Sequence, residues 1–151
     1  MSSHGLVLAA EDAEDLEIFS ARLQDAVGQI KDFVFLPKRR RFAAVLNRFK
    51  WEKAERGRDG GNVRVQSGLH FDDVLSVKSK NLKASSPDAV VSLLTIRYAP
   101  NSGDDSGGTV ELYFSGGGVI RLEVECIDAG LSDMSGEWAA RGRPAHEFGE
   151  P

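Results

Sequence analysis

The stretch Thr109–Cys126, TVELYFSGGGVIRLEVEC, decides the fold class. Apolar residues alternate with polar ones on both sides of three consecutive glycines: Val110, Leu112 and Phe114 before them, and Ile120, Leu122, Val124 and Cys126 after them. Alternation with period two is typical of a half-buried strand, because successive side chains point to opposite faces. The stretch therefore predicts a β-hairpin with one buried and one solvated face, and it places Cys126 in the core.

The residues on both sides of this hairpin predict further strands. Short runs rich in β-branched and aromatic residues occur at 32–36 (DFVFL), 42–51 (FAAVLNRFKW) and 90–98 (VVSLLTIRY). From residue 63 onward, apolar residues at odd positions predict one long strand, or two that meet at a bend near Gly68 or Asp73. Residues 5–10 predict a short first strand or an extended lead-in.

One helix is expected, close to the N-terminus. Asp12 is a suitable N-cap, and the glutamates around it place negative charge at the positive end of the helix dipole. Gly28 is expected to mark the helix end. Apolar residues recur at helical spacing and predict one buried stripe: Leu16, Phe19, Leu23, Val27 and Ile30.

These elements predict an α+β fold in which one N-terminal helix packs on a mainly antiparallel sheet. About seven strands would form a strongly curled sheet or a partly open barrel. A chain of 151 residues fits a single domain. We expect an ordered core over 5–140, exposed loops at 52–62 and 101–108, and a tail at 141–151.

The composition excludes several classes of protein. The single cysteine, Cys126, rules out an internal disulfide and a cysteine-based metal cluster. No signal peptide is apparent, and no apolar run approaches the ~18 residues of a membrane span. We therefore expect a cytoplasmic protein without membrane contact, bound metal or cofactor.

Residues able to carry catalysis are few, and the sequence predicts no catalytic residue. Metalloprotease, Walker and Ser–His–Asp patterns are absent. His70 occupies an even position in a strand whose odd positions point inward, so it should face solvent or a partner. Asp72, on the same face, is its only local carboxylate, and such a pair alone is weak support for acid–base chemistry.

The uneven charge distribution is more informative. Residues 37–83 hold thirteen Lys and Arg against five Asp and Glu, a balance of +8, whereas the rest of the chain has a balance of −12. Such asymmetry can mark a surface for acidic or phosphate-rich partners. The candidate binding residues are Lys38, Arg39, Arg40, Arg41, Arg48, Lys50 and His70.

Several motifs together resemble a known family. They are LQDAV at 23–27, RFAAVLNRFKWE at 41–52, LHF at 69–71, SLLTIRY at 92–98, GGGVIRLEVECI at 116–127, and RPAH at 143–146. The chain is similar, from about residue 8 to residue 146, to an alphaproteobacterial domain-of-unknown-function family of short cytosolic proteins. The resemblance implies no activity and no catalytic residues.

Three functions remain open. The first is a non-enzymatic cytosolic interaction module that self-associates or binds a protein partner, because strand 42–51 carries apolar residues on both faces. The second is binding of a polyanion or RNA through the basic segment 38–58. The third is an enzyme or sensor for a small anionic metabolite, using His70, Arg48 or Arg97. Alternatively, the acidic helix could neutralise the basic segment internally.

Overall fold

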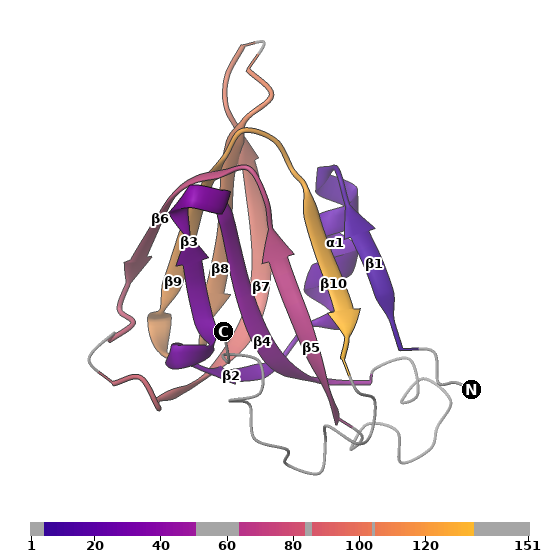
Figure 1. Cartoon of the computed structure of the whole chain (residues 1–151), viewed down its shortest axis with the longest axis vertical. Helices are drawn as coiled ribbons and strands as arrows, with labels where there is room; N and C mark the ends of the chain where they lie inside the picture. The colour runs from indigo at the N-terminus through magenta and orange to yellow at the C-terminus, as the bar shows by residue number, and fades with distance from the viewer. Residues whose placement is uncertain (1–4, 51–63, 84–85, 104, 135–151) are drawn as a thin grey trace.

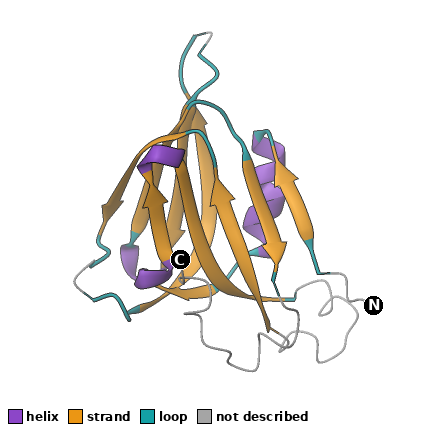
Figure 2. Cartoon of the chain, viewed as in Figure 1, coloured by secondary structure: helices purple, strands orange, loops and turns teal. Residues whose placement is uncertain are grey.

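A computed structural model describes residues 5–50, 64–83, 86–103 and 105–134. Its regular elements follow one another as β1 (Val7–Ala10), α1 (Ala13–Arg22), β2 (Val27–Gln29), η1 (Ile30–Asp32), β3 (Phe33–Leu36), η2 (Pro37–Arg39), β4 (Arg41–Phe49), β5 (Arg64–Phe71), β6 (Val74–Lys80), β7 (Val90–Pro100), β8 (Gly108–Phe114), η4 (Ser115–Gly117), β9 (Val119–Val124) and β10 (Ala129–Asp133), where η denotes a single 3-10 turn. Figure 2 shows that strands dominate, so the predicted α+β class is confirmed.

The strands form one antiparallel sheet in the order β1-β10-β5-β4-β2-β7-β8-β9-β6, with β3 added beside β4. The sheet curls into two layers, with β3, β4, β5, β10 and β1 facing β7, β8 and β9 (Figure 1). The short strand β2 joins the layers, since Val27 pairs with Asn47 of β4 and with Ser92 of β7. The sheet is not closed, and its path ends at β1 and β6.

The described sheet has ten strands, so the prediction of about seven is wrong. Part of the difference comes from β2, which was assigned to the helix. The helix ends at Arg22, well before Gly28, and Asp25 adopts a left-handed backbone (φ 66°). Backbone hydrogen bonds then tie the chain to β7, with Leu93 N donating to Ala26 O at 2.8 Å. Pairing with β7 therefore competes with continuation of the helix.

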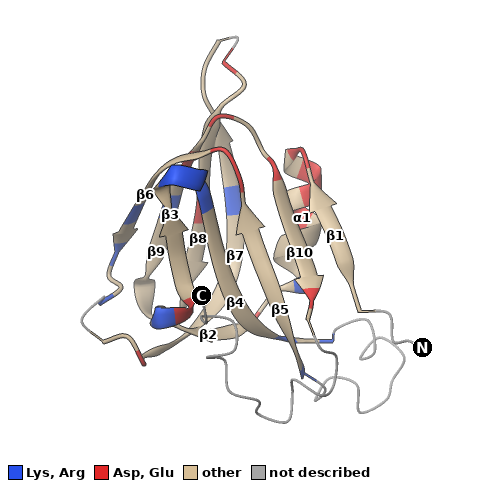
Figure 3. Cartoon of the chain, in the orientation of Figure 1, with Lys and Arg blue, Asp and Glu red and all other residues tan. Residues whose placement is uncertain are grey.

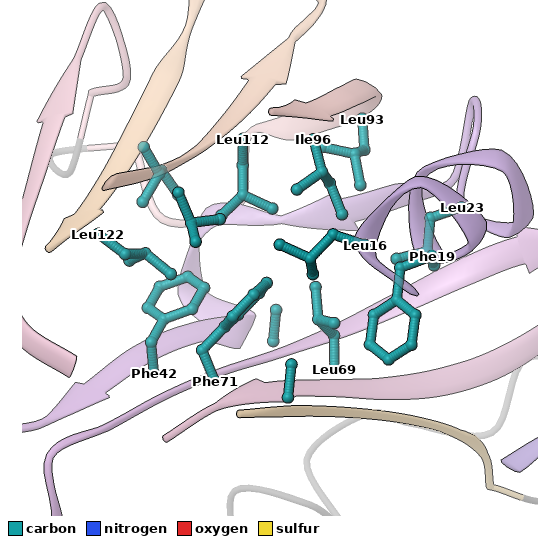
Figure 4. Close-up of a cluster of buried hydrophobic side chains, with 14 of the residues drawn as sticks. Leu16, Phe19, Leu23, Phe42, Leu69, Phe71, Leu93, Ile96, Leu112 and Leu122 are labelled. Atoms are coloured by element: carbon teal, nitrogen blue, oxygen red, sulfur yellow. The ribbon is translucent and has the colours of Figure 1, made fainter. Parts of the chain in front are cut away.

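The start of α1 is as predicted. The Asp12 side chain accepts a hydrogen bond from the Asp15 amide at 2.8 Å, which satisfies one of the free donors of the first turn. On the inner face Leu16 and Phe19 are buried, and Leu23 completes the stripe as the C-cap residue. Figure 4 shows these three side chains among core residues of both layers. The helix thus fills the space between β1 and β7.

The core between the layers is apolar and contiguous. Phe42, Leu69 and Phe71 project from β4 and β5, while Leu93, Ile96, Leu112 and Leu122 project from the opposite layer (Figure 4). Full burial of one such side chain stabilises a fold by about 1.5–3 kcal/mol. The period-two pattern of the β8–β9 hairpin therefore predicted its buried face correctly, as Val110, Leu112 and Phe114 are all buried.

Two expectations from strict alternation are wrong. Cys126 lies beyond the end of β9 and is only half-buried, with Sγ 3.4 Å from Asp73 Oδ2. The odd positions of 63–77 do not all point inward, because the pairing register of β6 with β9 shifts between Val74 and Ser76. This bulge buries Val74 and leaves Leu75 half exposed.

A buried ion pair joins three strands at one end of the layer formed by β3, β4, β5, β10 and β1, which we call the front layer. Arg48 of β4 is fully buried, and its Nε and a terminal nitrogen each donate to Asp133 of β10 at 2.9 Å. Ser67 of β5 donates to Asp133 at 2.7 Å, and the backbone amide of Leu6 donates at 2.9 Å. Four hydrogen bonds therefore satisfy both oxygens of one carboxylate.

These contacts control the ionisation of Asp133. Burial alone raises the pKa of this carboxyl group, but hydrogen bonds from Arg48, the Leu6 amide and Ser67, together with the arginine charge, outweigh burial. The pKa of Asp133 is therefore held below its ordinary value of 3.8. The carboxylate stays charged in the folded protein, which matches the permanent charge of Arg48.

Removing one partner of this pair should strongly destabilise the fold. Arg48→Met leaves the buried Asp133 carboxylate without its cation, and Asp133→Asn removes the carboxylate that binds two nitrogens of the buried Arg48. Losses of this kind cost about 3–5 kcal/mol of unfolding free energy. The double variant Arg48→Met/Asp133→Asn combines the same two substitutions and should lose much less unfolding free energy than the sum of the two single variants. Chemical denaturation measures all three. The partly exposed pair Arg41–Asp72 is the control, since Arg41→Met should cost no more than about 1 kcal/mol. Additive single effects would contradict this account.

The same pair predicts a dependence of stability on pH. The pKa of Asp133 is lower in the folded protein than in the unfolded chain. The ionised carboxylate therefore contributes fully to the free energy of unfolding above pH 3.8, and this contribution is lost as the pH falls through the pKa of the folded protein. The difference in unfolding free energy between wild type and Asp133→Asn should therefore shrink upon acidification. Denaturation curves at neutral and acidic pH measure that difference. Other carboxylates are shared by both proteins and cancel, so a constant difference would refute the assignment.

Candidate functional site

The predicted basic segment begins in η2, where its charges differ in their surroundings. Lys38 and Arg39 are exposed. Arg40 has a left-handed backbone and forms an ion pair with Glu125 at 2.7 Å. Arg41 holds Asp72 through two nitrogens, at 2.7 and 3.3 Å, and these hydrogen bonds lower the pKa of Asp72. Two of these four cations, Arg40 and Arg41, are therefore neutralised by nearby carboxylates.

The neutralising residues do not come from the acidic helix. Asp72 lies in the turn between β5 and β6, and Glu125 lies in the connection between β9 and β10. Figure 3 shows the acidic residues of α1 far from η2 and β6. Carboxylates of two turns at one end of the sheet, and not those of the helix, thus neutralise Arg40 and Arg41.

Two other candidates lie further along β4. Arg48 is buried and engaged by Asp133, so it cannot meet a partner at the surface. Lys50 follows the last residue of β4 and is half-buried. The remaining basic residues of the predicted segment 38–58, and the predicted loop 52–62, lie outside the described residues.

His70 faces the outer side of the front layer, as its position in the alternation predicted. Its Nδ1 lies 3.3 Å from Asp72 Oδ2 but is buried and lacks a hydrogen bond of acceptable geometry within the described chain. The ring lies against Gly130, where an added Cβ would overlap it. Asp72 joins His70 and Arg41 on a sheet face, and none of the three lines a pocket described below.

Three hollows in the described surface are candidate sites. The first, of about 300 Å³, lies between β2, β4 and β5 and contains Gln29, Asp32, Asn47 and Gln66. Burial raises the pKa of Asp32, with a smaller opposing effect from Lys31. Asp32 is the only titratable group among the lining residues. An acid–base pair therefore cannot form there from these residues alone.

The second hollow, of about 390 Å³, lies on the outer faces of β6, β8 and β9. Glu111 accepts hydrogen bonds from Tyr113 at 2.6 Å and from Arg121 at 3.0 Å, and both lower the pKa of Glu111. Lys78 and Lys80 face the same hollow from β6. The cations therefore outnumber the carboxylate on this face.

The third hollow opens between β3 and β6 and reaches the core. We call it the β3–β6 groove, lined by Ile30, Phe33, Phe35, Phe42, Val77, Ser79, Leu82 and Ile120, with a volume of about 210 Å³. Its floor consists of the buried Phe42 and Ile120, while Phe35, Val77 and Leu82 are partly exposed. Phe33 packs on Phe42 and Phe114 with ring centroids 6.5 and 5.5 Å apart, so the apolar wall is preformed.

The groove is closed at both ends by backbone hydrogen bonds. At one end Val74 N, at the start of β6, donates to Arg40 O at 2.9 Å. At the other end Ile30 N and Lys31 N donate to Ala89 O and Pro87 O at 3.0 and 2.9 Å. Between these ties β6 diverges from β3 (Figure 1). The groove is thus a bounded opening in the wall of the curled sheet.

Both strands beside this opening have a free edge. Among the described strands β6 pairs with β9 alone and β3 with β4 alone. No backbone hydrogen bond joins residues 75–80 to any described element other than β9. The other end of the sheet differs, because α1 lies along β1 (Figure 1). The β3–β6 groove therefore combines an apolar floor with unsatisfied strand edges.

Positive charge surrounds this apolar floor. Lys38 and Arg39 lie in η2 at one end, Lys78 and Lys80 lie along β6, and Lys83 follows Leu82 (Figure 3). All five are exposed. Five of the ten described Lys and Arg of residues 37–83 thus lie around the β3–β6 groove, and only the fold shows that they are neighbours.

Sequence reasoning identified the charges but missed the groove. Phe33, Phe35 and Val77 were recognised as strand residues, yet nothing local shows that residues 33–36 and 74–80 meet without pairing. The one available signal was the pair of lysines in β6, since charged residues on a strand commonly protect a free edge.

The described residues do not support a metal site, a reactive thiolate or a membrane-spanning helix. No group of three His, Cys, Asp or Glu side chains that could hold a metal occurs there. Burial, followed by the effect of Asp73, raises the pKa of the Cys126 thiol, which disfavours a reactive thiolate. In the same part of the chain, no helix has the length and apolar character needed to cross a bilayer.

Comparison with known proteins gives the family. No curated protein and no solved structure matches the chain significantly. Residues 6–146 match the family model described as "Protein of unknown function (DUF2948)", which spans nearly the whole described fold. The resemblance to a domain-of-unknown-function family is thereby confirmed, and the chain belongs to this family.

Proposed function

We propose that the protein is a non-enzymatic interaction module that binds an extended segment of another protein in the β3–β6 groove. The observation that carries the proposal is the presence of two free strand edges beside an apolar floor. Strand addition to an exposed edge is a common mode of peptide recognition, in which backbone hydrogen bonds give affinity and side-chain pockets give specificity. A cytoplasmic location forms part of the proposal and accords with the single free thiol.

The size of the groove favours a peptide side chain over a cofactor. Sites for drug-sized ligands usually measure about 300–1,000 Å³, whereas an engineered apolar cavity of about 150 Å³ holds benzene. The groove, at about 210 Å³, fits one aromatic or leucine-sized side chain. Burying such an anchor contributes about 1.5–3 kcal/mol to binding, and the strand edges supply further hydrogen bonds.

The charges around the groove favour a different chain over a second copy. If β6 paired with β6 of another molecule, four lysines, Lys78 and Lys80 from each copy, would gather at one seam. Like charges across paired strands destabilise the pairing. Lysines on an edge strand protect a protein from self-pairing in this way.

Binding of a polyanion is the second candidate, favoured by the exposed Lys38, Arg39, Lys78 and Lys80 (Figure 3). Single-stranded nucleic acid would also require exposed aromatic rings for stacking. Phe42 is buried, the ring of Phe49 is covered by Arg64 at 4.5 Å, and Phe35 is only partly exposed, within the apolar groove. We therefore rank a protein segment above a nucleic acid.

Selection of peptides from a displayed random library tests the proposal. Wild-type protein should enrich peptides whose binding is lost in Ser79→Trp, because Ser79 lines the groove and the indole would fill it. Ser76→Trp is the matched control, since it makes the same substitution on the outward face of the same strand, opposite Glu123. Binding should survive in Ser76→Trp.

Two outcomes would overturn the proposal. Peptides that bind wild type and Ser79→Trp equally would show that the groove is not the site. Light scattering of the free protein should give a monomer at every concentration, and a dimer abolished by Ser79→Trp would make a second copy the occupant. Thermal unfolding of both tryptophan variants confirms that each remains folded.

A further inference from the structure

We infer that the segment bound in the β3–β6 groove is a β-strand in which apolar residues alternate with aspartate or glutamate. This inference rests on the proposed function and specifies its partner. It follows from the two faces of β6, which differ sharply in chemistry although they belong to the same seven-residue strand.

The inward face of β6 lies beside the apolar lining of the groove. Val77 and Ser79 pair with Leu122 and Ile120 of β9, which are buried, and both line the groove. A strand added at the free edge directs every second side chain to this same face. Those side chains would lie over Phe35, Val77 and Leu82, where an apolar group is required.

The outward face of β6 carries the opposite chemistry. Lys78 and Lys80 pair with Arg121 and Val119 of β9. Arg121 already has an anionic partner in Glu111, at 2.8 Å. No ion pair between either lysine and a described residue is present. The intermediate side chains of an added strand would lie beside these lysines, where a carboxylate is favoured.

The alternation follows from these two faces together. Inward positions select apolar groups by burial, and outward positions select carboxylates by cross-strand ion pairing. Because β6 is an edge strand with its lysines in register two residues apart, both could be engaged by acidic residues two apart in the partner. Neither face alone would specify such a sequence.

Synthetic peptides as long as β6 test the inference against the full-length protein. One peptide alternates leucine with glutamate, a second alternates leucine with lysine, and a third has the glutamate composition in a non-alternating order. Titration calorimetry or fluorescence polarisation should show binding of the first and weak or no binding of the other two. Affinity should also fall as salt is raised, because the outward pairs are exposed.

Charge reversal supplies the decisive variant. Lys78→Glu/Lys80→Glu should weaken binding of the glutamate peptide by at least about tenfold and should restore binding of the lysine peptide. Lys38→Glu/Arg39→Glu makes the same change in net charge beside the groove but off the strand, so its effect should be clearly smaller. Equal effects of the two double variants would mean a general field of positive charge, and the inference would fail.

Failure of the inference is distinguishable from failure of the proposed function. If library peptides bind in a manner that Ser79→Trp abolishes but show no acidic alternation, the groove is a peptide site and the inferred sequence is wrong. If the glutamate peptide binds Ser79→Trp as well as wild type, the groove itself is not the site. N-methylation of alternate peptide amides should abolish binding in at least one of the two registers, and tolerance in both would exclude strand pairing.

Discussion

The ion pair between Arg48 and Asp133 is the contact on which the front layer depends. It joins β4 to β10 directly, recruits Ser67 of β5, and fixes the approach to β1 through the Leu6 amide. Charges of this kind stabilise a fold only when every donor and acceptor is satisfied, because desolvation costs several kcal/mol per ion. The pair therefore specifies which strands are neighbours, and the apolar core supplies most of the stability.

The groove is a consequence of how the two layers diverge. The front layer, formed by β3, β4, β5, β10 and β1, is fixed at the Arg48 end, and β2 ties it to β7. At the other end, a hydrogen bond from Val74 N to Arg40 O holds the start of β6 to the residue that follows η2. Between these points β3 and β6 do not pair, so the buried core residues Phe42 and Ile120 form the floor of an opening. The basic residues 38–41 lie at the rim of this opening, and Glu125 and Asp72 neutralise two of them, Arg40 and Arg41.

Local patterns predicted the elements that have strong periodicity. The β8–β9 hairpin and the start of α1 at Asp12 follow from alternation and capping. Of the alternatives left open for residues 63–77, the structure has two strands with the bend at Asp73, whose backbone is left-handed. The three-residue β2 is too short for any period to be visible. The bulge after Val74 breaks the alternation locally, so Val74 is buried and Leu75 is exposed, whereas Val77 points inward as expected. The burial of Arg48 and the meeting of β3 with β6 are long-range events. They depend on Asp133 and on residues 74–80, which no window around β3 or β4 contains.

The position of α1 has a consequence for stoichiometry. The helix lies along β1, so one end of the sheet is covered, and the free edges of β3 and β6 share a single opening at the other end. A fibre grows when each molecule presents two complementary ends and pairing passes from one to the next. Because α1 covers the β1 end of the sheet, a bound molecule has no second edge to which a further molecule can pair. The fold can therefore accept an incoming strand without supporting polymerisation.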